Sequence, residues 1–323
     1  MERVRKILEG SGPFLLTTHI NPDADGLGCV LAVHLFLKAR GRESYPLVEE
    51  TPPEFLDFLH GFEDLLLPED LPRSPEECVA LVFDLSEADR LGRLAETVLA
   101  ARERVILDHH AVTGRPLPGI HFRDSQAPAT AFLLFQVLRD LGDLSPEVAE
   151  NLYTGLYSDT GGFRFENTRE EAFRAAAELV RAGARPAWVG ERLLENHPPA
   201  RFELLRLVLE RREVLAGGQA VISWLTLKDF EEAGAQPAEA EDFATFLRSM
   251  RGVEVSALVK EVKPGEIGVS LRSRGKINVA QLAASQGGGG HLRAAGFRKK
   301  EIPFPEVLDL VRGLLSSVLE VGL

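Results

Sequence analysis

The chain has 323 residues, of which 45% are hydrophobic and 27% are charged, and its formal net charge is -12. This length predicts two domains, the balance is typical of a globular protein, and the acidic charge argues against a protein that coats long nucleic acid. The longest apolar runs, such as residues 79–83, are too short to span a membrane, and the N-terminus lacks a secretory signal, so we expect a cytoplasmic protein without a membrane partner.

Short apolar runs alternate with helical stretches through the first half of the chain. The runs predicted as strands cover residues 14–18, 44–48, 78–83, 104–107 and 120–122. Near-continuous apolar runs are typical of parallel strands buried on both faces. Apolar spacing and caps predict helices over residues 26–38, 130–141, 146–157 and 169–181. The alternation therefore predicts an α/β domain, residues 1–185, with a parallel sheet flanked by helices.

A change of organisation follows at Pro186 and at His197-Pro198-Pro199, and residues 186–212 are predicted to form a helical linker. The remaining residues, 213–323, are predicted to form a smaller α/β domain with a mixed sheet. Its expected elements are a strand over 220–225, a helix over 243–248, a hairpin of 256–260 with 267–271, a glycine-rich loop over 287–290 and a helix over 304–318. We therefore expect a bilobed molecule with a central cleft.

The charge is unevenly distributed along the chain. The window from Arg251 to Lys300 has ten Lys or Arg and three Asp or Glu, so it carries +7 and the rest of the chain carries -19. A locally basic segment on an acidic protein suits a small anionic ligand better than a long duplex, although a solvated charged face would show the same composition. The two cysteines, Cys29 and Cys78, form no CxxC pair and are expected to be buried and reduced.

The first candidate site is the segment 17–26, which follows the first predicted strand and precedes a helix. In an open parallel sheet, ligands bind beyond the carboxyl ends of the strands. This turn contains one imidazole, His19, and two carboxylates, Asp23 and Asp25, that can point to either side of a tight loop and serve different metal ions. A turn rich in Asp and Asn with a helix cap would explain the same residues without a ligand.

The ends of two further predicted strands also have acidic or imidazole side chains. Asp84 follows the strand at 78–83, and Asp108-His109-His110 follow the strand at 104–107. The two adjacent histidines should diverge, so that one binds metal while the other faces substrate, and Asp108 is placed to fix a ring tautomer. A helix cap is the alternative role for Asp84.

A fourth acidic group, Asp159, is predicted in the loop after the helix that ends near Tyr157, where a helix C-terminal turn is the alternative reading. The coincidence of these groups in one α/β domain predicts a metal site. The inferred ligands are His19, Asp23, Asp25, Asp84, His109 and Asp159. Carboxylates and imidazoles without thiolate favour Mn²⁺ or Mg²⁺, and six groups suit two ions roughly 4 Å apart, bridged by Asp84 and a water or hydroxide.

These residues resemble the motifs of the DHH phosphoesterase superfamily. The resemblance joins His19-x-x-x-Asp23-x-Asp25 to the first motif, Asp84 to the second, Asp108-His109-His110 to the third and Asp159 to the fourth. The segment 287–296, GGGGHLRAAG, resembles the GGGH-x-x-AAG motif of the first type of DHH-associated domain. One departure is the second motif, which continues Asp84-Leu85-Ser86 where many relatives have a small residue or Thr beside the Asp.

Within the superfamily, the two-domain plan is similar to the NrnA-type proteins, which are bifunctional oligoribonucleases and phosphatases of 3'-phosphoadenosine 5'-phosphate (pAp). The resemblance implies two Mn²⁺ ions, for which Mg²⁺ or Co²⁺ could substitute. It implies that one ion binds His19, Asp23 and Asp84 and that the other binds Asp25, Asp84, His109 and Asp159. It also implies that His110 lies toward the scissile phosphate, with Asp84 and Asp108 as the further catalytic residues.

The resemblance assigns substrate binding to the C-terminal domain. The implied contacts to the second phosphate or the base of the substrate are Arg272, Gly288, Gly289, Gly290 and His291. Glycines let backbone N–H groups approach an anion closely, and Arg272 offers a bidentate fork, whereas a flexible linker is the alternative reading of the glycines. Closure of the domains would position the phosphate for in-line attack by the bridging hydroxide.

The expected function is therefore hydrolysis of very short RNA or DNA oligonucleotides to 5'-mononucleotides and of pAp to AMP. A cyclic- or linear-dinucleotide phosphodiesterase on the same scaffold is the nearest alternative. A RecJ-like exonuclease is less expected because the chain is short and acidic, and a family II pyrophosphatase is disfavoured by the GGGGH segment. Outside enzymes, a nucleotide sensor is disfavoured by the intact ligand set. Whether the chain forms a homodimer is left open.

Overall fold

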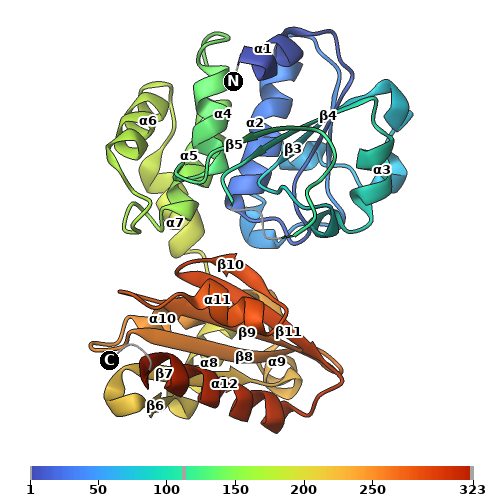
Figure 1. The fold of residues 1–323 in the computed structure, drawn as a ribbon. Helices are drawn as coiled ribbons and strands as arrows, with labels where there is room; N and C mark the ends of the chain where they lie inside the picture. The colour runs from blue at the N-terminus through green and yellow to red at the C-terminus, as the bar shows by residue number, and fades with distance from the viewer. Residues whose placement is uncertain (1, 111–113, 321–323) are drawn as a thin grey trace. The chain divides into compact units, whose positions relative to one another are not determined.

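The computed structural model describes residues 2–110 and 114–320, and the chain divides into two compact units, Met1–Asn196 and His197–Leu323 (Figure 1). The sheet of the first unit has the order β2-β1-β3-β4-β5, and every neighbouring pair is parallel. Its strands are β1 (Phe14–Thr17), β2 (Ser44–Leu47), β3 (Val79–Phe83), β4 (Glu103–Asp108) and β5 (Ile120–Arg123). The prediction of a parallel α/β domain is confirmed.

Helices cover both faces of this sheet because its central strands are apolar on both sides. The helices of the first unit are α1 (Glu2–Glu9), α2 (Ala24–Lys38), α3 (Leu94–Ala100), α4 (Thr130–Leu138), α5 (Pro146–Asp159), α6 (Glu170–Arg181) and α7 (Pro186–Leu194). Figure 1 shows α3 on one side of this sheet and α2 and α4 on the other. Leu16, Leu81 and Leu107 pack into a buried cluster with α1, α2 and α4 to α7, whereas Leu15 and Val82 belong to a cluster with α3. The period-two alternation of strand side chains explains this division.

Two helix ends differ from the sequence-based prediction in ways that affect the site. α2 begins at Ala24 rather than at residue 26, because Asp23 Oδ1 caps the helix by accepting the backbone N–H groups of Asp25 and Gly26, both at 3.0 Å. α5 continues to Asp159, so the prediction that Asp159 lies in a loop after a helix ending near Tyr157 was wrong. The helix ends only before Gly161, whose φ is 59°.

The second unit contains a mixed six-stranded sheet of order β10-β11-β9-β8-β7-β6, in which β7 and β8 are parallel and the other pairs are antiparallel. Its strands are β6 (Glu213–Leu215), β7 (Ala220–Leu225), β8 (Val255–Lys263), β9 (Glu266–Ser273), β10 (Gly289–His291) and β11 (Ala294–Lys300). The predicted hairpin of β8 and β9 and the mixed sheet are confirmed.

Helices flank this sheet as well. They are α8 (Pro199–Arg211), α9 (Leu227–Ala233), α10 (Phe243–Arg248), α11 (Val279–Ser285) and α12 (Phe304–Glu320). Val259 and Val269 belong to a buried cluster with α11 and α12, whereas Val221 and Leu258 belong to a cluster with α8, α9 and α10. Short 3-10 segments complete the connections in both units: Glu54–Leu56 (η1), Phe62–Asp64 (η2), Pro68–Asp70 (η3), Pro75–Glu77 (η4), Ala88–Leu91 (η5), Ala216–Gly218 (η6) and Pro237–Ala240 (η7).

The predicted glycine-rich loop at 287–290 was partly wrong. Gly289 and Gly290 belong to β10, which pairs antiparallel with β11, and the N–H groups of Gly287 and Gly288 donate to carbonyls at the end of α11. A side chain at position 288 would place its Cβ 2.1 Å from the Gly296 carbonyl oxygen, so close strand packing explains that glycine. The N–H groups of Gly287 and Gly288 are therefore already used within the protein and are not open to an anion.

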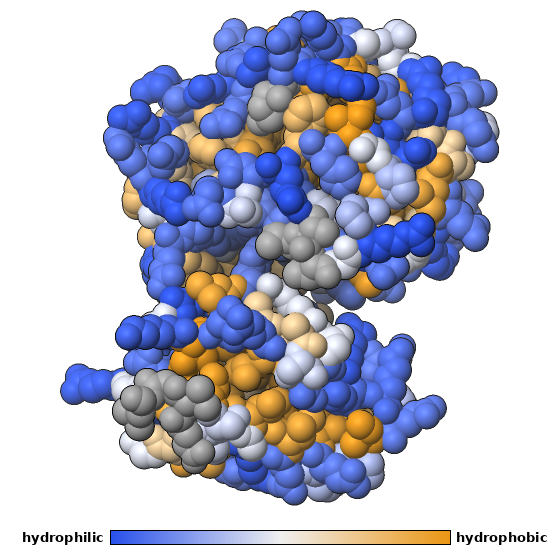
Figure 2. All heavy atoms as spheres, viewed as in Figure 1, coloured by the Kyte–Doolittle hydropathy of each residue, from blue (hydrophilic) through white to orange (hydrophobic). Residues whose placement is uncertain are grey.

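In the view shown, the surface of the first unit is mainly hydrophilic, whereas a broad hydrophobic area covers part of the second unit (Figure 2). Among the described residues, no helix is both long and apolar enough to cross a membrane. Both cysteines are buried and free, as predicted.

Candidate metal centre

The carboxyl ends of β1, β3 and β4 lie side by side, because these three strands are neighbours in the parallel sheet. His19 follows β1, Asp84 directly follows β3, and Asp108 is the last residue of β4. Parallel strands end at the same edge of a sheet, so residues far apart in sequence meet there. This topology gathers the predicted site residues of the first unit.

Asp84 lies at the centre of the group. Its backbone has a left-handed conformation, with φ of 62°, which Asp tolerates better than most residues and which turns the chain sharply after β3. Its N–H donates to the Leu107 carbonyl at 2.9 Å. Its side chain is fully buried, and Oδ2 has no hydrogen-bond partner among the described residues. A buried carboxylate oxygen without a donor is costly, so this atom indicates a missing positive partner.

One cluster consists of His19, Asp23 and Asp84. His19 Nδ1 donates to the Ile20 carbonyl at 2.8 Å, which leaves the lone pair on Nε2. That Nε2 atom lies 3.5 Å from Asp84 Oδ2 and 3.7 Å from Asp23 Oδ2. Asp23 uses its two oxygens differently: Oδ1 caps α2, and Oδ2 faces His19. Asp23 can therefore cap the helix and bind a cation at the same time.

A second cluster consists of Asp25, Asp84 and His109, and Asp159 lies beside it. His109 Nδ1 donates to the Ala127 carbonyl at 3.2 Å, and its Nε2 lies 3.6 Å from Asp84 Oδ1 and 2.9 Å from Asp159 Oδ2. Asp25 is fully buried and lies near both of these carboxylates. The two clusters therefore share Asp84.

Asp108 holds His110 rather than pointing away from the site. Its Oδ1 accepts the backbone N–H and Nδ1 of His110, both at 2.9 Å, and its Oδ2 accepts the Ser86 hydroxyl at 2.5 Å. His110 Nδ1 also lies 3.4 Å from Asp84 Oδ1. The rings of His109 and His110 meet edge to face, with an angle of 73° between their planes. The rings of these two adjacent histidines therefore point in different directions within the site.

The titration behaviour of the two clusters reflects their crowded carboxylates. Although burial opposes the charge, the Asp23 and Asp84 carboxylates beside the ring attract it and raise the pKa of His19 to about 10. Asp159 similarly outweighs burial and raises the pKa of His109 to about 11. Burial, with repulsion from Asp159 and Asp84, raises the pKa of Asp25 well above its ordinary value. This behaviour shows an excess of negative charge that divalent cations would neutralise in place of protons.

The donor set fits two divalent cations. The potential ligand atoms of the first cluster lie within 4.8 Å of one another, and so do those of Asp25, Asp84 and His109. Each cluster combines carboxylates with an imidazole and lacks thiolate, a combination suited to hard or borderline divalent metals. The orphaned buried atoms His19 Nε2 and Asp84 Oδ2 are where a cation would supply the missing partner.

The family models match both parts of the chain: "DHH family, N-terminal domain" matches residues 13–156 and "DHHA1 domain" matches residues 217–317. The bifunctional oligoribonuclease and PAP phosphatase NrnA of Thermus thermophilus is 34% identical over 98% of this chain and 94% of its own length. The chain belongs to the DHH phosphoesterase family. As a member of this family it is a metal-dependent hydrolase.

The chain is also similar to a second kind of phosphodiesterase and to a solved structure. The cyclic-di-AMP phosphodiesterase PdeA of Listeria monocytogenes is 26% identical over 94% of this chain, and the chain covers 47% of that protein. Among solved structures, an exopolyphosphatase-related protein from Bacteroides fragilis has a TM-score of 0.89 and 25% identity, with coverage of 98% of this chain and 95% of the other. The likeness thus extends over both units.

The predicted substrate-binding residues of this DHH protein all lie in the second unit. Arg272, on β9, donates from Nε to the Thr245 hydroxyl at 3.2 Å and from Nη1 to the Leu271 carbonyl at 3.0 Å. His291 ends β10 and is exposed. Arg272 is thereby held in one direction by α10, and the remaining N–H groups of its guanidinium are compatible with an anion.

Several site residues were not identified from the sequence. Thr130 begins α4 and donates to Asp84, Gly155 lies against Asp25, and Ser86 donates to Asp108. Thr130 resembled an ordinary helix start and Gly155 an ordinary helix interior. Only Ser86 gave a signal, because it lies two residues after Asp84 in the second motif.

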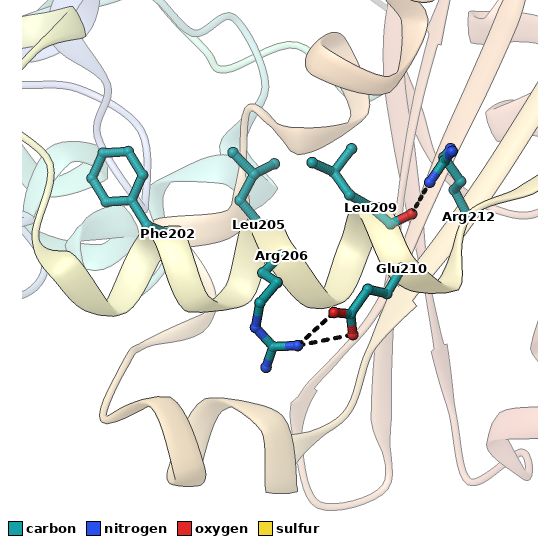
Figure 3. Close-up of a pocket in the computed structure, with 6 residues that line it drawn as sticks. All are labelled: Phe202, Leu205, Arg206, Leu209, Glu210 and Arg212. Carbon is teal, nitrogen blue, oxygen red and sulfur yellow. Dashed lines mark hydrogen bonds and ion pairs between the residues drawn. The ribbon is translucent and has the colours of Figure 1, made fainter.

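A separate hollow of about 360 Å³ lies along α8 (Figure 3). Phe202, Leu205 and Leu209 form its apolar part, while Arg206 and Glu210 pair with each other at 2.8 Å. None of the predicted site residues lines it. The remaining lining residue, Arg212, donates to the Leu209 carbonyl (Figure 3).

Proposed function

We propose that the protein is a Mn²⁺-dependent phosphoesterase that hydrolyses very short oligoribonucleotides to 5'-mononucleotides and pAp to AMP. The observation that supports this most is the pair of His and Asp clusters that share Asp84 at one edge of the parallel sheet. The choice of substrates comes from the NrnA relative, which is 34% identical over almost the full length of both chains.

The proposed ligand sets follow the two clusters. His19, Asp23 and Asp84 would hold one cation. The second would be held by Asp25, Asp84, His109 and Asp159. Bound there, the two divalent cations would stabilise charge on a phosphoryl oxygen and lower the pKa of a water molecule.

The neighbouring residues of the protein have roles of their own. Asp108 fixes the ring of His110 through two hydrogen bonds, so His110 is held ready to contact the phosphate. Hydrogen bonds that His110 donates to Asp108 and Asp84 outweigh the effect of burial and raise the pKa of His110 to about 9. A protonated His110 would attract the phosphate and could donate a proton to the leaving oxygen. In the second unit, Arg272 would bind the other phosphate of pAp through its guanidinium fork.

A dinucleotide phosphodiesterase is the second candidate, because PdeA matches 94% of this chain at 26% identity. The same ligand set would serve both reactions, so the metal centre does not distinguish them. The chain spans about half the length of PdeA, and the substrate of that relative is a weaker guide than that of NrnA.

A substrate panel tests the proposal. Purified protein with Mn²⁺ would be given pAp, di- to pentaribonucleotides, pApA, pGpG and cyclic di-AMP, and the products would be separated by chromatography. The proposal expects AMP from pAp and 5'-mononucleotides from the short RNAs. Turnover of cyclic di-AMP alone would favour the second candidate. If the protein left both pAp and the short RNAs intact, the proposal would be defeated.

A further inference from the structure

Thr130 contacts both clusters of the metal centre although it belongs to neither. It is fully buried as the first residue of α4. Its hydroxyl donates to Asp84 Oδ1 at 2.7 Å, and its backbone N–H donates to Asp25 Oδ2 at 2.7 Å. A carboxylate only accepts, so the hydroxyl hydrogen must point at Asp84.

The hydroxyl of Thr130 does not cap its own helix. The residue before it, Ala129, has no side chain that could cap α4, and Thr130 Oγ1 is used for Asp84 instead. The first N–H groups of α4 are satisfied by Asp25, which accepts from Thr130 at 2.7 Å and from Ala131 at 2.8 Å. Asp25 of α2 thus caps α4 from another helix, and the start of α4 is fixed relative to the site.

The α5 helix closes the other side of this arrangement. A Cβ at Gly155 would lie 2.6 Å from Asp25 Oδ1 and 2.9 Å from the Cβ of Ala131. The carboxylate of Asp25 is therefore held between the start of α4 and the backbone of α5. The Thr130 hydroxyl, which extends from the same rigid turn, has a fixed place opposite Asp84.

This placement matters because the carboxylate torsion of Asp is soft. The terminal torsion of an Asp side chain has a broad distribution, and a site needs its ligands held within roughly 0.5 Å and 10–20°. A donor on Oδ1 fixes that torsion and directs the partnerless Oδ2 toward His19. Groups that orient ligands in this way typically change metal affinity by about 10–100-fold when they are removed.

We propose that Thr130 is a positioning residue that orients Asp84 for divalent metal binding through its hydroxyl. The inference rests on the proposed function, because it takes Asp84 as a ligand of both ions. It extends that function by assigning to α4 a role in the metal centre.

Three variants separate the hydroxyl from the shape of the side chain. Thr130→Val keeps the volume and the N–H to Asp25 but removes the donor to Asp84. Thr130→Ser keeps the donor. Thr154→Val is the matched control, because Thr154 is equally buried in the same unit and its hydroxyl only donates back to the Glu150 carbonyl within α5.

Mn²⁺ affinity is measured by calorimetry without substrate, and kcat and KM for pAp are measured at limiting and saturating Mn²⁺. We expect Thr130→Val to bind Mn²⁺ about 10–100-fold more weakly, with lower kcat, nearly unchanged KM and partial recovery at saturating Mn²⁺. Thr130→Ser should stay within about 3-fold of wild type, and Thr154→Val should match it.

Wild-type Mn²⁺ affinity in Thr130→Val would overturn the proposal, and so would equal weakening in Thr130→Ser, because shape rather than the donor would then decide. If Thr130→Val does not fold, Thr130→Ala takes its place under the same criteria. A wild-type protein that binds Mn²⁺ but cleaves neither pAp nor short RNA defeats the proposed function alone, while the binding series still decides the role of Thr130. Absence of Mn²⁺ binding by the wild type would overturn both.

Discussion

The carboxylate of Asp84 connects the two halves of the metal centre. It lies 3.5 Å from His19 on one side and 3.6 Å from His109 on the other, and the nearby imidazoles of His110 and His19 outweigh burial and hold its pKa well below the ordinary value. Burial and the neighbouring carboxylates both favour the protonated form, so only nearby positive groups keep this carboxylate ionised. It is therefore the residue whose loss should affect both cations together.

Asp84→Asn should reduce kcat for pAp by more than about 100-fold, because removal of even an outer partner typically costs 10–100-fold and this residue contacts both clusters. Substrate affinity, measured by calorimetry, should change much less, since the predicted substrate contacts lie in the second unit. The matched control is Asp143→Asn, which makes the same charge change at an exposed position and should leave kcat unaltered. If the protein were a nucleotide sensor without catalytic activity, the wild type and Asp84→Asn would both lack turnover, and Asp84→Asn would only bind the ligand more weakly.

At the level of single residues, the sequence allowed the prediction of those site residues that follow apolar strands. His19, Asp84 and His109 follow buried strands, and the structure brings them together as that position implied. Thr130 could not be identified in this way, because its role depends on which atom its hydroxyl reaches across 46 positions in the sequence. Periodicity and motif spacing contain no information about such a contact.

Close packing of α2, α4 and α5 gives the metal centre its rigid frame. Gly28 of α2 lies against the backbone of Asn151 in α5, where a Cβ would approach the carbonyl oxygen to 2.7 Å. Gly155 similarly lets α5 approach Asp25. Helices this close leave no room for even one added methyl group.

Gly155→Ala should therefore lower the free energy of unfolding by about 1–3 kcal/mol, because the helices must move apart to accept the new Cβ. Mn²⁺ affinity should fall as well, since Asp25 would be displaced. Gly190→Ala in α7 is the control: its Cβ would lie 3.5 Å from the Tyr157 hydroxyl, an ordinary contact, so stability should rise by up to about 1 kcal/mol. Equal stability of the two variants in thermal and urea unfolding would show that the frame is less tight than the structure indicates.

In the second unit, Asp229 links two helices. Its carboxylate accepts two hydrogen bonds from Arg211 at the end of α8, at 2.5 and 2.7 Å, and accepts the N–H of Thr226 at the start of α9 at 2.7 Å. These partners outweigh burial and lower the pKa of Asp229 to about 2. The ion pair is well shielded, because only 6% of the Asp229 side chain is exposed.

A depressed pKa in the folded state stabilises the protein above the unfolded pKa, near 4, and this stabilisation is lost as the pH falls toward 2. The free energy of unfolding of the wild type should therefore be higher than that of Asp229→Asn at pH 5. This difference between the two proteins should be about 2 kcal/mol smaller at pH 2 than at pH 5. Urea unfolding of the second unit across this pH range checks it. Asp309→Asn, which removes an exposed partner of Arg312, should change stability little. A gap between wild type and Asp229→Asn that does not depend on pH would contradict the assignment.

The boundaries of elements were predictable where a cap or a glycine marked them and uncertain elsewhere. Ser145 and Pro146 marked the start of α5 correctly. The strand β10 was not predicted, because its two glycines and one histidine have low strand propensity and form a strand only through pairing with β11. The short helices α3, α9 and α11 lacked enough turns to show a clear period.

At the scale of the whole molecule, the two units have separate hydrophobic cores. Among the described residues, no buried core cluster combines residues of both units. The fold class and the presence of two parts could be predicted from the alternation of elements and from the prolines near residue 197. The first unit contains the proposed cation ligands, and the second unit contains the proposed substrate contacts.

Separate cores predict two unfolding transitions, of which only one responds to metal. Mn²⁺ at 100 times its dissociation constant should stabilise the first unit by about 2.7 kcal/mol per site, because the cations bind only the folded clusters. Calorimetric scans with Mn²⁺ and with a chelator should therefore shift one transition and leave the other in place. Asp84→Asn should abolish the shift, and an equal shift of both transitions would contradict two independent cores.

The most direct test of the metal centre is anomalous diffraction at the manganese edge from crystals grown with Mn²⁺. We predict two anomalous peaks in the first unit, one beside His19 and Asp23 and the other beside Asp25 and His109, with Asp84 next to both. Peaks at other residues, or a single ion that Asp84 does not contact, would contradict it.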